Sequence, residues 1–478
     1  MSKNTHENKA SSPKEVVISL YQAQEKIYPR RIFGYFARWR WVMIWITQLF
    51  FYGVPWLEWG QRQALLFDLN AKRFYIFKLV LYPQDLIYLT VILIIAALSL
   101  FLFTAVAGRL WCGYACPQTV YTEMFLWVER EIEGDRAKRM KLDAASMSFE
   151  KFARKLTKHV IWLSLAAWTG FTFVGYFTPI RELATDIMFF DLSSWGVFWV
   201  VFYSVATYGN AGFIREQVCK YMCPYARFQS AMFDEDTLMV TYDEARGEPR
   251  GAGSRKLNEA KTETLGACID CSLCVQVCPT GIDIRDGLQY ECIGCGLCAD
   301  VCNHVMDKVS EPRGLIQYTT QNAMDHQWTR REMFKRILRP RVLIYSSLLS
   351  LLMIGLLTSL WLRTPFKVDV VRDRSVLARL VEGGMLQNVY RLQIMNATEN
   401  LHRYQLKVGG LENAKVGFTG SDQHALIAVE PAQARWIVVN IDVPDGSLAT
   451  GKHKIQFEIE EMDTQATLIE RSIFLVPR

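Results

Sequence analysis

The sequence predicts a multi-domain membrane protein with an α-helical transmembrane bundle, a cysteine-rich cytoplasmic insert and a C-terminal all-β sandwich. Three observations predict this architecture. Long uncharged apolar stretches recur through the first three quarters of the 478 residues, 51% of which are hydrophobic. Eight of the 12 cysteines fall into two closely spaced runs. The last quarter has short alternating apolar segments separated by turn residues.

The membrane bundle is predicted from five apolar stretches that carry no charged residue. They are residues 41–57, 86–107, 160–177, 192–214 and 342–362. Apart from the first, which is short and contains Pro55, each is about as long as a helix that crosses a ~30 Å hydrocarbon core. Buried helices of a soluble protein are the alternative, but five such stretches favour an integral membrane protein. The polar residues before 41 show no cleavable signal peptide.

The uneven distribution of lysine and arginine between the loops predicts the orientation. Basic residues are frequent before residue 41 and in the loop 129–158, whereas 178–193 carries only Arg181. These loops place the N-terminus in the cytoplasm, and five spans then place the C-terminus outside. The basic residues in 56–85 mildly oppose this orientation. Segment 119–128, which contains Glu123, is expected to be a helix at the cytoplasmic interface. The net charge of +6 reflects sidedness and requires no nucleic-acid partner.

The cysteine-rich insert contains two copies of the spacing C-x2-C-x2-C-x3-C. The first is Cys268, Cys271, Cys274 and Cys278, and the second is Cys292, Cys295, Cys298 and Cys302. This ferredoxin-type spacing directs three thiolates to one iron–sulfur cluster and the fourth to its neighbour. We therefore expect one [4Fe–4S] cluster on Cys268, Cys271, Cys274 and Cys302, and another on Cys292, Cys295, Cys298 and Cys278. Zinc is the alternative, but zinc motifs pair two C-x2-C knuckles and leave the other cysteines unused.

Two details of cysteine placement add to this prediction. The second run ends in Cys302-Asn303 where the first ends in Cys278-Pro279, so the turn after the second run is expected to be less rigid. No cysteine follows Cys302. A thiol-free C-terminal region suits an oxidising compartment, whereas reduced thiols and clusters suit the cytoplasm.

Composition divides the chain into five parts. We expect a cytoplasmic arm (1–40), a four-span membrane domain (41–214), a cytoplasmic domain with the ferredoxin-type runs (215–335), a fifth transmembrane helix (336–365) and a β-sandwich (366–478). The sandwich is predicted from six alternating segments, 366–371, 389–395, 404–408, 436–441, 453–458 and 468–474, with turn residues between them.

The four remaining cysteines form a repeated motif, C-x-Y-x-C-P. Cys112 and Cys116 precede Pro117, and Cys219 and Cys223 precede Pro224; each motif follows a predicted span and an arginine, Arg109 or Arg215. The spacing would place both thiols of a pair on one helical turn. They are candidate catalytic residues that bind copper with help from the Met222 thioether, relay electrons as a dithiol, or hold a third cluster together. Buried structural cysteines are the remaining alternative.

These motifs resemble one known family. W-C-G-Y-A-C-P-Q at 111–118, C-K-Y-M-C-P-Y-A-R-F-Q at 219–229, the double ferredoxin run and P-R-G-L-I-Q-Y at 312–318 are similar to the FixG/RdxA/CcoG proteins. The resemblance covers nearly the whole chain. It implies an immunoglobulin-like C-terminal domain in the periplasm and a location in the bacterial inner membrane. It also implies a cupric reductase that serves assembly of cbb3-type cytochrome c oxidase.

The resemblance implies partners as well: copper-transport proteins, oxidase assembly proteins and an electron donor that the sequence does not identify. Two alternatives remain. NapH-like membrane ferredoxins place similar C-x3-C-P motifs after their spans and pass quinol electrons to a periplasmic reductase. A non-catalytic assembly scaffold would keep its clusters for structure alone. Copper-dependent reoxidation of reduced clusters would separate a cupric reductase from both alternatives. Quinol-dependent reduction would favour a NapH-like ferredoxin.

Overall fold

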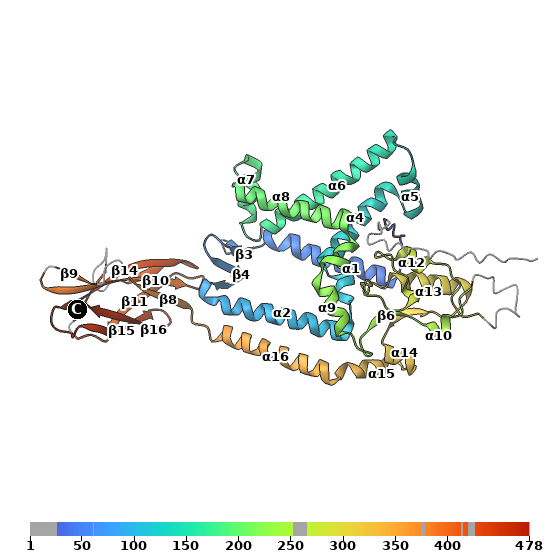
Figure 1. The fold of residues 1–478 in the computed structure, drawn as a ribbon. Coiled ribbons are helices and arrows are strands. Elements are labelled where there is room, and N and C mark those ends of the chain that lie inside the picture. Colours follow the sequence, from blue (N-terminus) through green and yellow to red (C-terminus); the bar gives the residue numbers. More distant parts are fainter. Residues whose placement is uncertain are drawn as a thin grey trace, which may run out of the picture.

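The computed structural model describes residues 26–60, 62–251, 265–373, 378–381, 383–412, 414–418 and 426–477. Figure 1 shows an elongated molecule, with the C-terminal strands at one end, long helices in the middle and the cysteine-rich region at the other end. The predicted N-terminal arm lies largely outside the described residues.

Three described helical segments are long and apolar enough to cross a membrane: Pro83–Ala107, Ser194–Ile214 and Pro340–Trp361. The first contains α2 (Leu86–Ala107), the second α8 (Ser194–Gly209) and the turn η3 (Asn210–Ile214), and the third is α16 (Pro340–Trp361). Helices α2 and α16 run side by side (Figure 1). Few of their side chains are buried by protein, as expected for helices that present apolar side chains to lipid.

The other two predicted spans are also helical but are more polar. Helix α1 (Tyr35–Gly53) begins before the apolar stretch, includes Arg38 and Arg40, and ends where Pro55 starts a short 3-10 turn. Helix α6 (Phe149–Val174) has basic first turns that include Lys155 and Lys158. The five-span arrangement therefore remains a prediction for α1 and α6.

Shorter helices connect these segments. They are α3 (Leu110–Tyr114), α4 (Pro117–Glu133), α5 (Arg136–Ala144), α7 (Ile180–Phe189) and α9 (Pro224–Met232). Helix α4 covers the segment that was expected at the membrane interface. It packs against α6 and η3, and Phe125 and Glu129 on α4 are fully buried. Helix α4 is thus a central packing element.

The cysteine-rich region is built around a small antiparallel ribbon of β6 (Met239–Tyr242) and β7 (Ile316–Thr319). Around it lie α10 (Glu244–Gly247), α12 (Leu273–Val277), α13 (Leu297–Val309), α14 (Gln321–Asp325) and α15 (Arg330–Lys335). Cys302 lies inside α13, which continues beyond Asn303. The expectation of a looser turn after Cys302 is therefore wrong: no turn occurs there, and a proline would interrupt the helix.

The start of α1 is joined to this region by a carboxylate from α13. Oxygens of Asp300 accept hydrogen bonds from the backbone amides of Phe36 (3.2 Å) and Ala37 (2.8 Å). These amides belong to the first turn of α1, which has no partners for them within the helix. A Cβ atom at Gly34 would overlap the Asp300 carboxyl group, so only glycine leaves room for this cap.

The C-terminal β-domain (residues 366–477) contains two antiparallel sheets, which confirms the all-β prediction. One sheet has the order β12 (Lys415–Phe418), β14 (Ala434–Pro444), β10 (Met385–Asn396), β8 (Phe366–Arg372), with β9 (Arg379–Val381) also on β10. The other has the order β13 (Ile427–Val429), β11 (His402–Gly409), β15 (Gly451–Glu461), β16 (Thr467–Val476). Alternating residues of both sheets, including Tyr390, Ile441 and Phe457, form the buried core.

The segment between α1 and α2 folds into strands that sequence reasoning missed. A ribbon of β1 (Glu58–Trp59) and β2 (Arg62–Gln63) is followed by a sheet of β3 (Leu65–Asp68), β4 (Arg73–Ile76) and β5 (Leu79–Leu81). Side chains of this sheet pack against Met395 and Ala432 of the β-domain. The Tyr82 hydroxyl donates a 2.7 Å hydrogen bond to the Asn396 carbonyl oxygen. The segment between α1 and α2 is therefore packed directly against the β-domain.

Candidate functional site

The two ferredoxin-type runs share one backbone conformation. Asp270 and Ser272 of the first run have φ of 51° and 54°, and Gly294 and Gly296 at the same positions of the second have 64° and 73°. These left-handed residues turn the chain sharply between successive cysteines. Glycine is needed in the second run, because a Cβ at Gly296 would lie 2.8 Å from Phe36 of α1.

The fold brings the eight cysteines together in two groups. Cys302 interacts electrostatically with Cys268, Cys271 and Cys274 of the first run. Cys278 interacts with the three thiols of the second run, Cys292, Cys295 and Cys298. In each group, three thiols come from one run and the fourth from the other, which is the grouping that the spacing predicts. Which thiols bind each cluster remains a prediction.

The second group fits a soft polynuclear centre. A cavity is lined by Cys278, Cys292, Cys295 and Cys298 and also by Cys274 of the first run. Burial raises the pKa of Cys292 to about 12 and that of Cys295 to about 11. Buried thiols of this kind stay protonated unless a metal centre replaces their protons. The donor set therefore suits an iron–sulfur cluster.

The C-x-Y-x-C-P motifs do not form single helical turns, so that expectation is wrong. Cys112 lies in α3, and Cys116 is the residue that precedes α4. Cys219 lies in the turn η4 (Val218–Met222), and Cys223 precedes α9. In each motif the proline occupies the first position of the next helix, which suits proline because that position needs no amide donor. Each pair therefore spans a break between two helical segments.

The two motifs also share backbone geometry. We call each apolar helix together with the motif that follows it a repeat: α2 with Cys112 and Cys116, and α8 with Cys219 and Cys223. Gly108 and Arg215 each lie four positions before the first cysteine of their motif. Their backbone angles are nearly equal: φ 54° and ψ −121° at Gly108, and φ 47° and ψ −114° at Arg215. The amide of Cys116 donates to the carbonyl of Trp111, and that of Cys223 donates to Val218, at the same spacing. The two arginines that the sequence paired are not equivalent, because Arg109 follows Gly108 while Arg215 occupies the strained position itself.

The two repeats exchange contacts through the residue after each proline. Gln118 donates from Nε2 to the carbonyl oxygens of Asn210 and Arg215, both at 3.0 Å, at the end of the second repeat's apolar helix. The Tyr225 hydroxyl donates to the Leu100 carbonyl oxygen at 3.1 Å and also pairs with Thr104, near the end of α2. Each motif thus holds the helix end of the other repeat.

This exchange places four thiols together in what we call the four-thiol site: Cys112, Cys116, Cys219 and Cys223. The Cys219 thiol interacts electrostatically with the other three. Burial raises the pKa of Cys112 to about 11 and that of Cys219 to about 12. The Cys112 thiol donates a 3.3 Å hydrogen bond to Oε1 of Gln229, which is fully buried.

The four-thiol site packs directly on the second ferredoxin-type run. A Cβ at Gly113 would lie 2.9 Å from the carbonyl oxygens of Ile293 and Gly294. The Tyr114 hydroxyl donates a 3.0 Å hydrogen bond to the Cys295 carbonyl oxygen. The Arg109 guanidinium donates to the carbonyl oxygens of Cys292 (3.2 Å) and Ala226 (2.5 Å). Arg109 also interacts electrostatically with Cys112, Cys219 and Cys292, so it links the two groups of cysteines.

A buried charge network supports the second C-x-Y-x-C-P motif. Glu129 is fully buried and lies 2.9 Å from the Arg215 guanidinium and 3.3 Å from that of Arg139. Burial alone would raise the pKa of Glu129, but Arg215 and Lys158 outweigh burial and lower this pKa to about 2. The arginine in the strained conformation is thus fixed by a carboxylate from α4.

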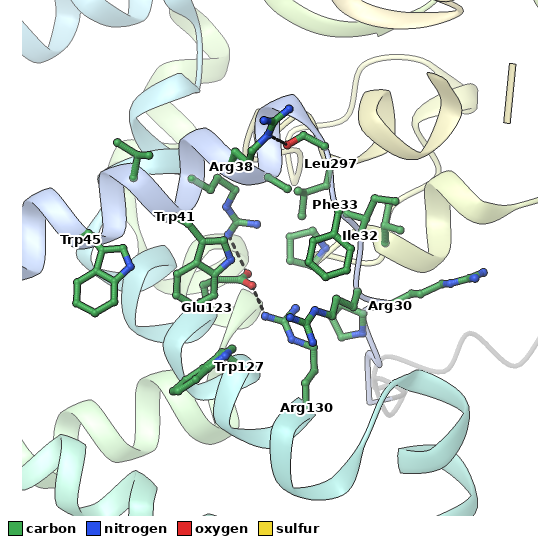
Figure 2. A pocket seen from close by; sticks show the side chains of 18 residues that line it. Arg30, Ile32, Phe33, Arg38, Trp41, Trp45, Glu123, Trp127, Arg130 and Leu297 are labelled. Atoms are coloured by element: carbon green, nitrogen blue, oxygen red, sulfur yellow. Dashed lines mark hydrogen bonds and ion pairs between the residues drawn. The ribbon is translucent and has the colours of Figure 1, made fainter. Parts of the chain in front are cut away.

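A cavity of about 490 Å³ borders the second run beside α1 and α4. Figure 2 shows Trp41, Trp45 and Trp127 on one side and Leu297 of the second run on the other. Glu123 lies within the lining, paired with Arg130 (2.6 Å) and Arg40 (3.2 Å). The cavity combines aromatic surface with an excess of arginine.

Sequence reasoning missed most of the polar residues of the site. Gln118 and Gln229 have no local signal, because their partners are about a hundred or more positions away in the chain. The tyrosine in C-x-Y-x-C-P could have been found from the repeat, but its partner could not. His159 has its Nδ1 atom 2.9 Å from the Tyr208 hydroxyl and so links α6 to α8.

Three family models match this chain. A 4Fe-4S dicluster domain matches residues 214–321, and a 4Fe-4S binding domain matches residues 89–133. The IG-like fold at the C-terminal of FixG matches residues 356–477. The chain therefore carries two 4Fe–4S binding domains and an immunoglobulin-like C-terminal domain. Each iron–sulfur match includes one C-x-Y-x-C-P motif, and the cysteines of the 89–133 match are Cys112 and Cys116.

Curated relatives match over most of their length. The nitrogen fixation protein FixG of Rhizobium meliloti is 36% identical over 96% of this chain and 94% of its own. Protein RdxB of Cereibacter sphaeroides is 40% identical over 83% of this chain and 85% of its own. Protein RdxA of the same organism is 35% identical over 94% of this chain and 92% of its own. A solved FixG-related protein from Vibrio parahaemolyticus is 25% identical, covers 24% of this chain and 97% of its own, and has a TM-score of 0.21. Through these relatives and the FixG C-terminal domain, the chain belongs to the FixG/RdxA/CcoG family.

Proposed function

We propose that this iron–sulfur electron-transfer protein is a membrane-bound cupric reductase, which converts Cu(II) to Cu(I) at the four-thiol site for maturation of cbb3-type cytochrome c oxidase. One observation carries the proposal. Gly113 of the first C-x-Y-x-C-P motif packs without a gap on the backbone of the second ferredoxin-type run. A soft thiol site for a metal substrate thus adjoins a site that suits a one-electron cofactor.

The eight cysteines of the ferredoxin-type runs would hold two [4Fe–4S] clusters, which supply single electrons when bound. The four-thiol site has a different task. The four cysteines are partly exposed, and Tyr221 and Met222 between the second pair are exposed, so Cu(II) would reach the thiols from the surface of the protein. The thiols release their protons as they bind copper. Soft thiolates bind Cu(I) more favourably than Cu(II), which raises the reduction potential of the bound copper.

Arg109 has a positioning role in this proposal. Its positive charge lies among Cys112, Cys219 and Cys292 and offsets the negative charge of thiolates on both sides. Its hydrogen bonds to Cys292 and Ala226 hold the second run against the motif that contains Cys223. The copper substrate would therefore stay at a fixed separation from the electron source.

The test is the rate of copper reduction per bound iron in C116S and C223S, compared with the parent protein purified anaerobically. We expect both variants to keep their iron and to reduce copper at least about tenfold more slowly. A third cluster on the four-thiol site would instead lower the iron content of both variants. Structural cysteines would lower the amount of protein in the membrane. An unchanged rate per iron contradicts copper reduction at this site.

The cavity in Figure 2 favours a second candidate, oxidation of a membrane quinol. Its tryptophans and arginines could hold a quinol ring beside the second run. A quinol must also release protons, and the buried carboxylate of Glu123 is the available acceptor. Burial would raise the pKa of Glu123, but Arg40 and Arg130 outweigh it and lower this pKa, so Glu123 is a poor base. Reduction of bound iron by a quinol, abolished by W41A, would support this candidate.

The proposed setting follows from the apolar helices and the basic loops. We propose an inner-membrane location, with both groups of cysteines in the cytoplasm and the β-domain in the periplasm. Copper-transport and oxidase assembly proteins are the proposed partners, and the electron donor is unidentified. If the protein were a non-catalytic assembly scaffold, copper would reoxidise the reduced protein no faster than buffer alone.

A further inference from the structure

We propose that His402, Glu461 and Asp463 of the β-domain form a binding site for one divalent first-row transition-metal ion. This inference goes beyond the proposed function and uses none of the cysteines. The ligand atoms of these three side chains all lie within 4.8 Å of one another. Within the described ranges of the chain, these three form the group of histidine, cysteine and carboxylate side chains whose ligand atoms lie close enough together to hold one metal ion.

Rigid strands place two of the three ligands. His402 begins β11 and Glu461 ends β15, and these antiparallel strands lie side by side in one sheet (Figure 1). Tyr404, two residues after His402, is the direct partner of Glu461 in the register. Asp463 follows in the turn that leads to β16. The site therefore forms at the end of a sheet whose backbone hydrogen bonds fix two of its ligands.

Buried polar atoms at this site lack a full set of partners. Glu461 is fully buried, and its Oε1 atom lies 2.5 Å from Nδ1 of His402. Its other oxygen accepts a 2.6 Å hydrogen bond from the Thr464 hydroxyl. The hydroxyl of Tyr404, the register partner of Glu461, is buried without a hydrogen-bond partner among the described residues, which is costly. A buried carboxylate needs a positive partner, and either a protonated His402 or a metal ion at Oε1 would supply it.

The distances fit a metal ion after a small adjustment. Ligand atoms at 2.0–2.2 Å from one ion are separated by about 3.0–3.6 Å. Nδ1 of His402 already lies 3.1 Å from Oδ2 of Asp463. Its contact with Glu461 must widen by less than about 1 Å to reach that range. The Asp463 side chain is 60% exposed, so it can move, admit the ion and leave a position for water.

The donor set selects the class of metal. One imidazole and two carboxylates suit borderline and hard divalent ions such as Zn²⁺, Cu²⁺ and Mn²⁺, whereas Cu⁺ prefers sulfur. Affinity should rise from Mn²⁺ towards Cu²⁺ and fall again at Zn²⁺. The alternative is a simple ion pair, in which a protonated His402 lies between two carboxylates. That arrangement holds no metal, so binding experiments separate the two.

Mn²⁺ is the best probe for the full chain, because it binds only weakly to the thiolates that would capture softer metals. Free Mn²⁺ can be counted by its six-line paramagnetic resonance signal in detergent-solubilised, cluster-loaded protein. We expect one saturable Mn²⁺ per chain, which excess Zn²⁺ displaces. H402A should abolish this binding. The matched control H453A, which removes a partly exposed histidine of the same β-domain, should leave it unchanged.

D463N provides a second variant that does not disturb buried packing. It should weaken Mn²⁺ binding at least about tenfold. Zn²⁺ should raise the unfolding temperature of the β-domain in the parent but much less in D463N, because a ligand stabilises the state that binds it. Absence of saturable Mn²⁺ binding, or equal binding by the parent, H402A and D463N, would overturn the proposal and leave an ion pair.

Discussion

Arg109 donates a hydrogen bond from Nη1 to the carbonyl oxygen of Cys292, with the two atoms 3.2 Å apart. This contact joins the end of an apolar helix to the first cysteine of the second ferredoxin-type run. The other guanidinium nitrogen reaches Ala226, in the helix that follows the second C-x-Y-x-C-P motif. One side chain therefore connects three segments that are far apart in the chain, which makes the junction sensitive to the shape of that side chain.

R109K should weaken this junction without removing its charge. Lysine is a single point donor and does not reproduce the two diverging hydrogen bonds of the planar guanidinium. Loss of a buried hydrogen bond costs about 1–3 kcal/mol, so we expect slower copper reduction with unchanged iron content. R313K, at an exposed arginine of the same region, is the control. Equal rates per iron in R109K, R313K and the parent would contradict a positioning role for Arg109.

Iron content should distinguish the two kinds of cysteine. Two [4Fe–4S] clusters give about eight iron atoms and eight sulfides per chain. C271S should lose about half of the iron, since it removes a thiolate from one cluster, whereas C116S should lose none. Anaerobic purification followed by iron analysis and paramagnetic resonance of the reduced protein measures both. About twelve iron atoms in the parent would favour a third cluster, and zinc in place of iron would refute the cluster prediction.

E129Q should destabilise the protein at neutral pH. It leaves Arg215 and Arg139 without their buried partner, which typically costs about 3–5 kcal/mol. Because the folded state lowers the pKa of Glu129 to about 2, its contribution is full above an ordinary glutamate pKa of about 4.5 and disappears as the pH falls towards 2. The unfolding temperatures of parent and variant should therefore differ most near pH 7 and converge only as the pH falls to about 2.

E150Q is the matched control for this experiment. Glu150 pairs with Arg154 on the exposed surface of α6, and such pairs contribute about 0–1 kcal/mol. We expect E150Q to unfold with the parent at every pH. If E129Q did the same, the buried network would not contribute to stability.

Reporter fusions should place the two ends of α16 on opposite sides of the membrane. A reporter that is active only outside the cytoplasm should work after Thr364 and fail after Leu338, because α16 lies between these positions. Activity at both positions, or at neither, would exclude α16 as a span. The same pair of fusions also tests whether the β-domain faces the periplasm.

Periodicity and spacing predicted those parts of the fold that depend on near neighbours. All six predicted strand segments lie in strands, because one face of each packs in the buried core and imposes alternation. The missed strands β9, β12 and β13 have three or four residues, too few to show alternation. Strands β3 to β5 were missed because their apolar side chains pack on a domain that begins almost 300 residues later.

The grouping of the ferredoxin-type cysteines was predictable from the sequence, but the architecture of the candidate site was not. The C-x2-C spacing groups the ferredoxin-type cysteines, since a short loop limits where a sulfur can point. The same reasoning failed for C-x-Y-x-C-P, where Pro117 and Pro224 start new helices and break the turn between the cysteines. The exchange through Gln118 and Tyr225 depends on contacts between repeats, and no local pattern encodes such contacts.

The cap on α1 has a consequence for biosynthesis. The carboxylate that caps the first turn of this helix belongs to Asp300, which is 264 positions after Phe36. A ribosome therefore completes α1 and both repeats before it makes the residue that α1 requires at its start. Asp300 lies between Cys298 and Cys302 in α13, so its position depends on how these two cysteines are engaged. The first helix of the described residues thus acquires this contact only when the last cysteines of the chain have been made and folded.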